Sequence, residues 1–220
     1  QLRQQYAEEV QRADEQVGRI TTRLDELGLL DKTLIILTAD HGEMLGEHDY
    51  DFNHFSLYDE VIQIPLIVVP PGLHLKKQVV DAQVRLMDLP STILDYLQID
   101  AMEETEGVEL IGYGEGHRKA TMWCSLVGRE GRRASSGRLI GLRNNGIKYI
   151  RSLDEQREIL FDVVEDPAES TSLVGEQSEV LEAARRLVSS EAKALEVQLR
   201  EADQTEFGAR MMLEALGYTQ

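Results

Sequence analysis

The chain has 220 residues, of which 42% are hydrophobic and 29% charged, and its formal net charge is −17. A chain of this length can bury a substantial core, and no apolar run approaches the length needed to cross a bilayer. The acidic excess argues against a nucleic-acid partner, because phosphate binding needs basic patches. The single cysteine excludes an internal disulfide framework.

The first regular pattern predicts a helix that ends at about residue 27. Its apolar residues recur at alternating intervals of four and three, at Tyr6, Val10, Ala13, Val17, Ile20, Leu24 and Leu27. This spacing is also that of a short coiled coil. Gly28 can supply a C-cap and an apolar strand follows at once, so the sequence favours a helix laid on a sheet.

Two apolar runs and a further helix come next. The run that begins at Thr33 predicts a core strand over residues 33–37, buried on both faces as in α/β sheets. Residues 64–69 predict a second core strand, which the Pro-Pro-Gly at residues 70–72 ends. Pro90 is then placed in the first turn of a helix that reaches about Leu97.

The pattern changes between about residues 99 and 119. The glycine-rich stretch at residues 112–116 is interpreted as a flexible connector, because no Gly-Lys-Ser/Thr follows it as a phosphate loop would require. Beyond it the sequence predicts a small antiparallel sheet followed by a charged amphipathic helix. The predicted strands are residues 121–127, 138–143, 147–152 and 159–163, with a hairpin turn at 144–146, and the predicted helix is residues 176–199.

A candidate metal site lies at the end of the first strand, where the chain reads Asp40-His41-Gly42. Ligands of α/β sheets bind beyond the carboxyl ends of the strands. Gly42 tolerates torsions that could converge both preceding side chains on one ion. A carboxylate beside an imidazole suits several divalent cations. The alternative is that Asp40 caps the following turn and His41 is a surface residue.

The segments around this strand resemble those of one known family. They follow in order as Gly46-Glu47-His48, Leu57-Tyr58-Asp59-Glu60, Ile64 to Gly72, Asp88-Leu89-Pro90-Ser91-Thr92 and Leu160-Phe161-Asp162. In order and spacing they resemble the sulfatases, which belong to the alkaline phosphatase superfamily. The resemblance implies an α/β fold class. Residues 1–117 would be the C-terminal part of the helix-flanked catalytic sheet, and residues 118–220 a smaller antiparallel-sheet-plus-helix subdomain.

The same resemblance implies roles for particular residues. Asp40 and His41 would be ligands of a divalent metal ion, calcium in the first place, with manganese or zinc as alternatives. His54 would be catalytic, because sulfatases commonly carry Lys or His there to contact the sulfate or protonate the departing oxygen. His48 is interpreted as structural. The implied reaction is hydrolysis of a small-molecule or glycan sulfate ester.

The family's nucleophile motif, Cys/Ser-x-Pro-x-Arg, does not occur in this sequence. In sulfatases its Cys or Ser is oxidised to formylglycine, and an earlier strand supplies further metal-binding aspartates. Cys124 is followed by Leu126 and Gly128 where the motif needs proline and arginine, so we expect it to be a small buried residue. We therefore expect the chain to be the C-terminal portion of a longer enzyme, inactive alone, whose partner is the N-terminal portion of the same enzyme.

Two alternatives stay open at this point. An Asp-His pair also occurs in phosphodiester and phosphonate monoester hydrolases of the same superfamily, which these residues do not distinguish from sulfatases. A non-catalytic acidic interaction domain would have kept the scaffold without needing a metal.

His74 and His117 have no supporting motif and are expected at the surface, and the oligomeric state is left open.

Overall fold

The computed structural model describes residues 2–49, 52–72, 79–100, 106–110, 120–124, 139–144, 146–176 and 178–203, with side chains from 120 to 124 and beyond 193 excepted. Four predictions concern parts of the chain outside these residues: those for His74, for His117, for the connector at 112–116 and for the side chain of Cys124. The chain divides into two compact units, Gln1–Arg118 with Gly128–Ser136, and Lys119–Val127 with Gly137–Gln220. In the described part, no helix is both long and apolar enough to span a membrane.

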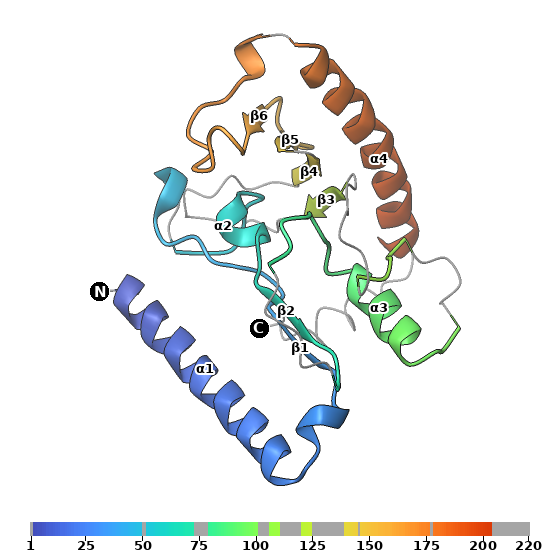
Figure 1. Ribbon diagram of the computed structural model, residues 1–220. Helices are drawn as coiled ribbons and strands as arrows, with labels where there is room; N and C mark the ends of the chain where they lie inside the picture. The colour runs from blue at the N-terminus through green and yellow to red at the C-terminus, as the bar shows by residue number, and fades with distance from the viewer. Residues whose placement is uncertain are drawn as a thin grey trace. The chain divides into compact units, whose positions relative to one another are not determined.

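The first unit begins with the long helix α1, Leu2–Glu26 (Figure 1). Its end is a Schellman motif, in which the N–H of Gly28 donates to the carbonyl of Asp25 and the N–H of Leu29 to that of Leu24, at 2.8 and 2.9 Å. Gly28 has a φ of +66°, which glycine adopts without steric cost. The helix therefore ends where the sequence predicts.

The short helix η1, Leu30–Lys32, leads into strand β1, Ile35–Thr38. Strand β1 pairs antiparallel with β2, Leu66–Val69, to form a two-stranded sheet. The expectation that the strand at residues 33–37 is buried on both faces is wrong for the described residues. Every residue of β1 is half-buried, and β2 alternates between half-buried and exposed, because two strands cannot cover both of their own faces.

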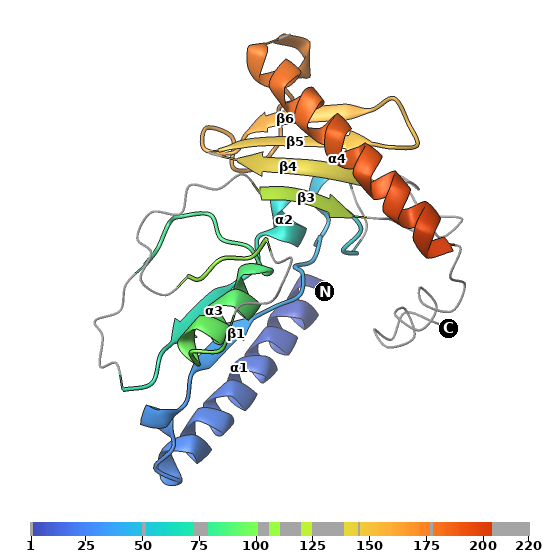
Figure 2. The ribbon, with the colours of Figure 1, turned by 90° about the vertical axis from the view of Figure 1, so that its right-hand side faces the viewer.

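Helix α1 runs alongside this sheet (Figures 1 and 2). A groove of about 390 Å³ separates them, lined by Val17 and Thr21 of the helix and by Ile35, Leu37 and Ile67 of the strands, among others. No residue of α1 is fully buried, so the helix is loosely packed. Its placement nevertheless agrees with a helix laid on a sheet and not with a separate coiled coil.

Three short helices complete the described part of this unit: η2, Glu47–Asp49, α2, Asp59–Ile62, and α3, Asp88–Tyr96. Helix α3 is fixed by the carboxylate of Asp88, which is 1% exposed. It accepts hydrogen bonds from the backbone and guanidinium of Arg85 and from the N–H of Val108. The segment at residues 106–110 is thereby held against the start of α3.

The second unit is a four-stranded antiparallel sheet with a helix across one face (Figure 2). Its strands, in spatial order, are β3, Ala120–Cys124, β4, Leu139–Asn144, β5, Ile147–Ser152, and β6, Glu158–Asp162. The short helix η3, Val174–Glu176, precedes the long helix α4, Glu179–Asp203. The predicted antiparallel sheet with a following helix is confirmed.

The core of the second unit joins β4, β5 and β6 to one stripe of α4. Its buried members are Ile140, Leu142, Tyr149, Leu160, Leu181, Ala184, Val188 and Ala192. At its edge the Tyr149 hydroxyl donates to the Glu158 carboxylate at 2.6 Å, and the Arg185 guanidinium pairs with the same carboxylate. Burial and the hydrogen bond to Glu158 raise the pKa of Tyr149. This network ties α4 to the sheet.

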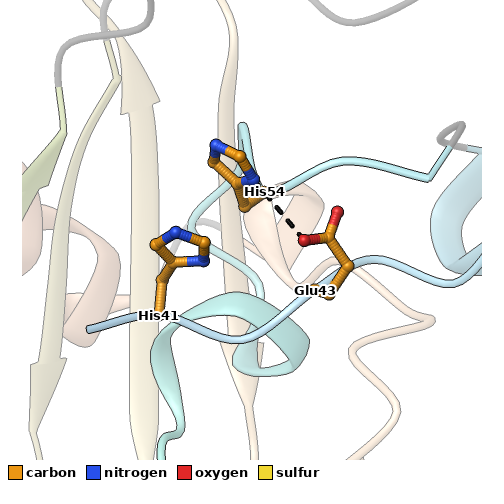
Figure 3. A group of neighbouring side chains, drawn as sticks. All are labelled: His41, Glu43 and His54. Atoms are coloured by element: carbon orange, nitrogen blue, oxygen red, sulfur yellow. Dashed lines mark ion pairs between the residues drawn. The ribbon is translucent and has the colours of Figure 1, made fainter. Parts of the chain in front are cut away.

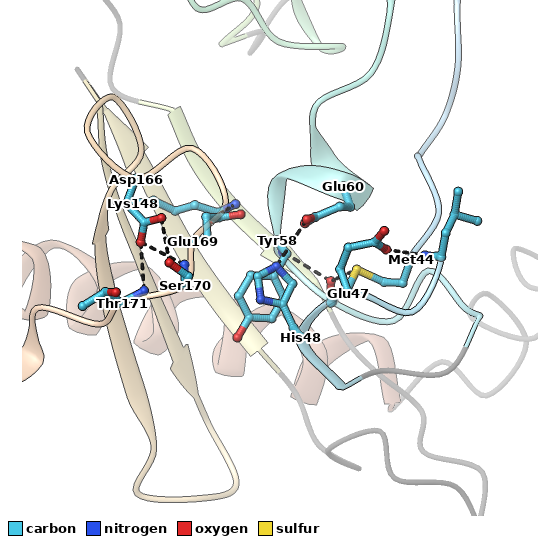
Figure 4. A network of polar contacts seen from close by, with 12 residues as sticks. Met44, Glu47, His48, Tyr58, Glu60, Lys148, Asp166, Glu169, Ser170 and Thr171 are labelled. Carbon is cyan, nitrogen blue, oxygen red and sulfur yellow. Dashed lines mark hydrogen bonds and ion pairs between the residues drawn. The ribbon is translucent and has the colours of Figure 1, made fainter. Parts of the chain in front are cut away.

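A buried ion pair lies in the same unit. Lys148 Nζ is 2.7 Å from Glu169 Oε1, and each side chain is 1% exposed. In Figure 4 the loop that carries Glu169 is further ordered by Asp166, whose carboxylate accepts the N–H groups of Ser170 and Thr171, both at 2.8 Å. Glu169 has a φ of +49°, which residues other than glycine seldom adopt. The ion pair with Lys148 and the hydrogen bonds to Asp166 hold the loop in this conformation.

Candidate active site

Asp40 and His41 follow directly after β1. Asp40 Oδ1 accepts the N–H of His41 at 2.9 Å, and its Oδ2 is 3.7 Å from Nε2 of the His41 ring. His41 Nδ1 is 2.8 Å from the carbonyl oxygen of Gly42, so Nδ1 carries the proton and the lone pair is on Nε2. The Asp40 carboxylate is 81% exposed. An open oxygen ligand and an oriented nitrogen ligand are thus side by side, which fits a divalent cation.

Gly42 fixes the chain just beyond this pair. Its N–H donates to the carbonyl of Val61 at 2.7 Å, and a Cβ at this position would lie 2.1 Å from the carbonyl oxygen of Glu60. The φ of Gly42 is not positive. The glycine is therefore required for the close approach of α2, and not for the unusual torsions that the sequence suggested.

His54 is brought to the same place by a short antiparallel contact. The N–H of Met44 donates to the carbonyl of Asn53 at 2.8 Å, and Met44 is fully buried. The next residue, His54, stacks its ring on that of His41, with centroids 4.2 Å apart and planes at 28° (Figure 3). The structure thus places the predicted catalytic histidine against a predicted metal ligand.

Glu43, to which the sequence motifs assign no role, joins this group in the structure. Its Oε2 is 3.5 Å from Nδ1 of His54, and both side chains are about one-third exposed or less. A ring nitrogen of His41, one of His54 and a carboxylate oxygen of Glu43 all lie within 4.8 Å of one another. Side chains alternate along an extended chain, so residues 41 and 43 lie on the same side of it. This spacing was the sequence signal that could have identified Glu43.

His48 does not join this group. Its ring stacks on Tyr58 at 3.8 Å with nearly parallel planes, and its Nε2 is 3.3 Å from Glu60 Oε1 (Figure 4). Both partners are at the start of α2, so the His48 side chain packs η2, to which it belongs, against the start of α2.

Glu47 organises the turn before His48. Its carboxylate accepts the N–H of Leu45 at 2.5 Å and pairs with Arg3 of α1 at 2.8 Å. Burial by itself raises the pKa of Glu47, but the backbone hydrogen bonds and the charge of Arg3 outweigh it and lower the pKa. The Gly-Glu-His segment is thus a structural turn that shapes the loop carrying His41 and Glu43.

Comparison with known proteins points to the same family that the sequence motifs resemble. The family model described as Sulfatase matches residues 1–99. An arylsulfatase of Clostridium perfringens (strain 13 / Type A) is 28% identical over 196 residues, which are 87% of this chain and 40% of that protein. The chain thus spans well under half the length of this relative.

Solved structures share the fold. A protein solved in complex with its substrate D-glucosamine-2-N,6-O-disulfate aligns with a TM-score of 0.71 and 24% identity, over 84% of this chain and 39% of the other. A phosphonate monoester hydrolase from Silicibacter pomeroyi aligns with a TM-score of 0.64 and 24% identity, over 85% of this chain and 38% of the other. The family match shows that residues 1–99 of the chain belong to the sulfatase family, and the solved structures show the fold that the chain shares with such proteins.

Proposed function

We propose that this chain is part of a metal-dependent sulfatase that hydrolyses a small-molecule or glycan sulfate ester. The observation that carries the proposal is the stacking of His54 on His41, beside Asp40, at the end of β1. Such a site needs three groups from this half of the enzyme. They are a carboxylate, an imidazole that can bind a metal and an imidazole that can move a proton. The family match and the arylsulfatase relative support the reaction class.

In this proposal residues 1–117 form the C-terminal half of the catalytic core and residues 118–220 the C-terminal subdomain. The N-terminal portion of the enzyme supplies the nucleophile and the remaining metal ligands. It is the partner of this chain, which is inactive alone. The chain's share of the arylsulfatase relative, 40% of its length, is in keeping with this division.

Asp40 and His41 hold the divalent ion. Calcium is the first choice, with manganese or zinc as alternatives, because a hard cation prefers oxygen ligands and Asp40 presents an open carboxylate. The bound ion offsets the negative charge that builds on the sulfate oxygens in the transition state. The hydrogen bond between His41 and the Gly42 carbonyl keeps the ring turned with Nε2 towards Asp40.

His54 delivers a proton to the departing oxygen of the ester. An imidazole can give or take a proton near neutral pH. Nε2 of His54 is buried without a hydrogen-bond partner among the described residues, so a substrate atom that reached it would displace no protein contact. Glu43 near Nδ1 and the His41 ring beneath it restrict how His54 can turn.

Leaving-group dependence tests this role. In the full-length enzyme, His54→Gln is expected to lower kcat about a hundredfold or more for an alkyl sulfate, whose leaving oxygen needs a proton. The loss is expected to be much smaller for 4-nitrophenyl sulfate, whose leaving group departs as a stable anion. Asp49→Asn, a substitution of a nearby exposed acid, is the control. Equal losses on both esters would remove the proton-donor role from His54.

The phosphonate monoester hydrolase of the same fold is the second candidate, because it also aligns over most of this chain. Parallel assays with an aryl sulfate and an aryl phosphonate monoester separate the two. The proposal requires the higher kcat/KM for the sulfate. A clear preference for the phosphonate would favour the second candidate.

A further inference from the structure

The cluster of His41, Glu43 and His54 offers a set of metal ligands different from the Asp40–His41 pair. It combines two imidazoles with one carboxylate, and their nearest ligand atoms lie within 4.8 Å (Figure 3). All three come from one compact unit and from two short segments joined by the Met44–Asn53 contact. The side chains of His41, Glu43 and His54 are 33, 26 and 30% exposed, so an ion can reach them from solvent.

The chemistry of this set differs from that of a calcium site. Calcium takes about six to eight oxygen ligands, whereas two imidazoles and one carboxylate suit zinc, cobalt and related transition metals. Zinc binds such ligands at about 2.0–2.2 Å, and an imidazole donates its lone pair in the plane of its ring. At least one of the stacked His41 and His54 rings must therefore turn before all three side chains can bind the ion. Their partial exposure leaves room for this movement, and Glu43 and His54 are already 3.5 Å apart.

We propose that His41, Glu43 and His54 form a binding site for a transition-metal cation of the zinc type. A neutral imidazole has one nitrogen lone pair, so His41 can serve this ion or the ion held with Asp40, and not both. Binding at the cluster also occupies the lone pair with which His54 takes up the proton that it delivers. The site is therefore inhibitory for sulfate hydrolysis, and this consequence rests on the proposed function.

Cobalt is a suitable probe, because its visible absorption reports the ligands that it binds. The metal-free 220-residue chain is titrated with Co²⁺, followed by displacement with Zn²⁺. We expect one Co²⁺ to bind per chain, and Glu43→Gln and His54→Gln each to weaken binding by about tenfold or more. Asp49→Asn removes an exposed acid that is no member of the cluster, and should change the affinity by less than about threefold. Far-UV circular dichroism checks that each variant is folded.

A second measurement needs no variant. Zn²⁺ should protect His41 and His54 of the wild-type chain from carbethoxylation by diethylpyrocarbonate, as read by mass spectrometry of the peptides. Absence of Co²⁺ binding, unchanged binding by both cluster variants, an equal loss in Asp49→Asn or unprotected histidines would each overturn the site. These outcomes are independent of turnover, so failure of the proposed sulfatase activity would leave the binding result standing.

Discussion

The imidazole rings of His41 and His54 are stacked, with their centroids 4.2 Å apart. One ring follows a strand and the other follows a loop, and the link between them is the hydrogen bond from Met44 to Asn53. A residue proposed as a metal ligand and one proposed as a proton donor are therefore in direct contact. Changes that move either segment are expected to affect both functions.

Substitution of Gly42 is expected to disturb the segment that carries His41, because the chain packs closely against α2 at this glycine. We expect Gly42→Ala to destabilise the first unit by about 1–3 kcal/mol, because the new Cβ would lie 2.1 Å from the Glu60 carbonyl oxygen and must push α2 away. Gly18→Ala is the matched control: nothing lies within 4 Å of its Cβ position, and alanine favours the middle of a helix. Urea unfolding of both variants provides the comparison, and equal stability of Gly42→Ala and wild type would contradict the packing described.

The buried pair of Lys148 and Glu169 predicts a large effect in the second unit. We expect Lys148→Met to cost about 3–5 kcal/mol, because it leaves the carboxylate of Glu169 buried without its cation. Replacement of both residues by apolar ones should recover much of this loss. The exposed pair of Arg12 and Glu9 serves as control, since Arg12→Met should have little effect on chemical denaturation.

The Glu158–Arg185 pair predicts how stability depends on pH. The hydrogen bonds from Arg185 lower the pKa of Glu158 below its ordinary value of 4.5, although burial opposes them. The folded chain therefore binds this proton more weakly than the unfolded chain does. Its contribution to the free energy of unfolding is complete above pH 4.5 and is lost as the pH falls through the lowered pKa.

Glu158→Gln should remove that part of the pH dependence, whereas the exposed Glu155→Gln should not. Denaturant unfolding between about pH 3 and pH 7 measures the difference between each variant and the wild-type chain. Parallel pH profiles for wild type and Glu158→Gln would show that this carboxylate is not coupled to folding.

Local patterns predicted the second unit well. Strand β5 was expected at residues 147–152 and is found at Ile147–Ser152, because Ile and Tyr favour strands and Gly146, with a φ of +81°, supplies the turn before it. The long helices were also located from their periodicity, to within a few residues at their ends.

Burial and close contacts were harder to predict. The apolar run of β1 suggested a strand covered on both faces, but covering depends on which segments pack against it. In the described residues β1 pairs with β2 and faces α1 across a groove. Glu43 was overlooked because its neighbour His54 comes from another segment. The steric role of Gly42 likewise depends on α2, which the strand motif does not specify.

The number of ligands that the chain supplies limits how tightly it can bind a hard cation by itself. Asp40 and His41 supply one carboxylate and one imidazole, whereas a hard cation takes about six or more donors. We expect calorimetric titration of the 220-residue chain to show only weak binding of Ca²⁺ or Mn²⁺, while the full-length enzyme binds the ion tightly. Tight Ca²⁺ binding by the chain alone would place the site elsewhere.

Turnover of an aryl sulfate by the full-length enzyme and its Asp40→Ala variant tests the central claim most directly. Loss of this carboxylate removes both affinity for the ion and stabilisation of the transition state, so we expect kcat/KM to fall about a hundredfold or more. The 220-residue chain should show no turnover, and Asp49→Asn in the full-length enzyme should match the wild type. Undiminished sulfate hydrolysis by Asp40→Ala would contradict the assignment of the active site to the end of β1.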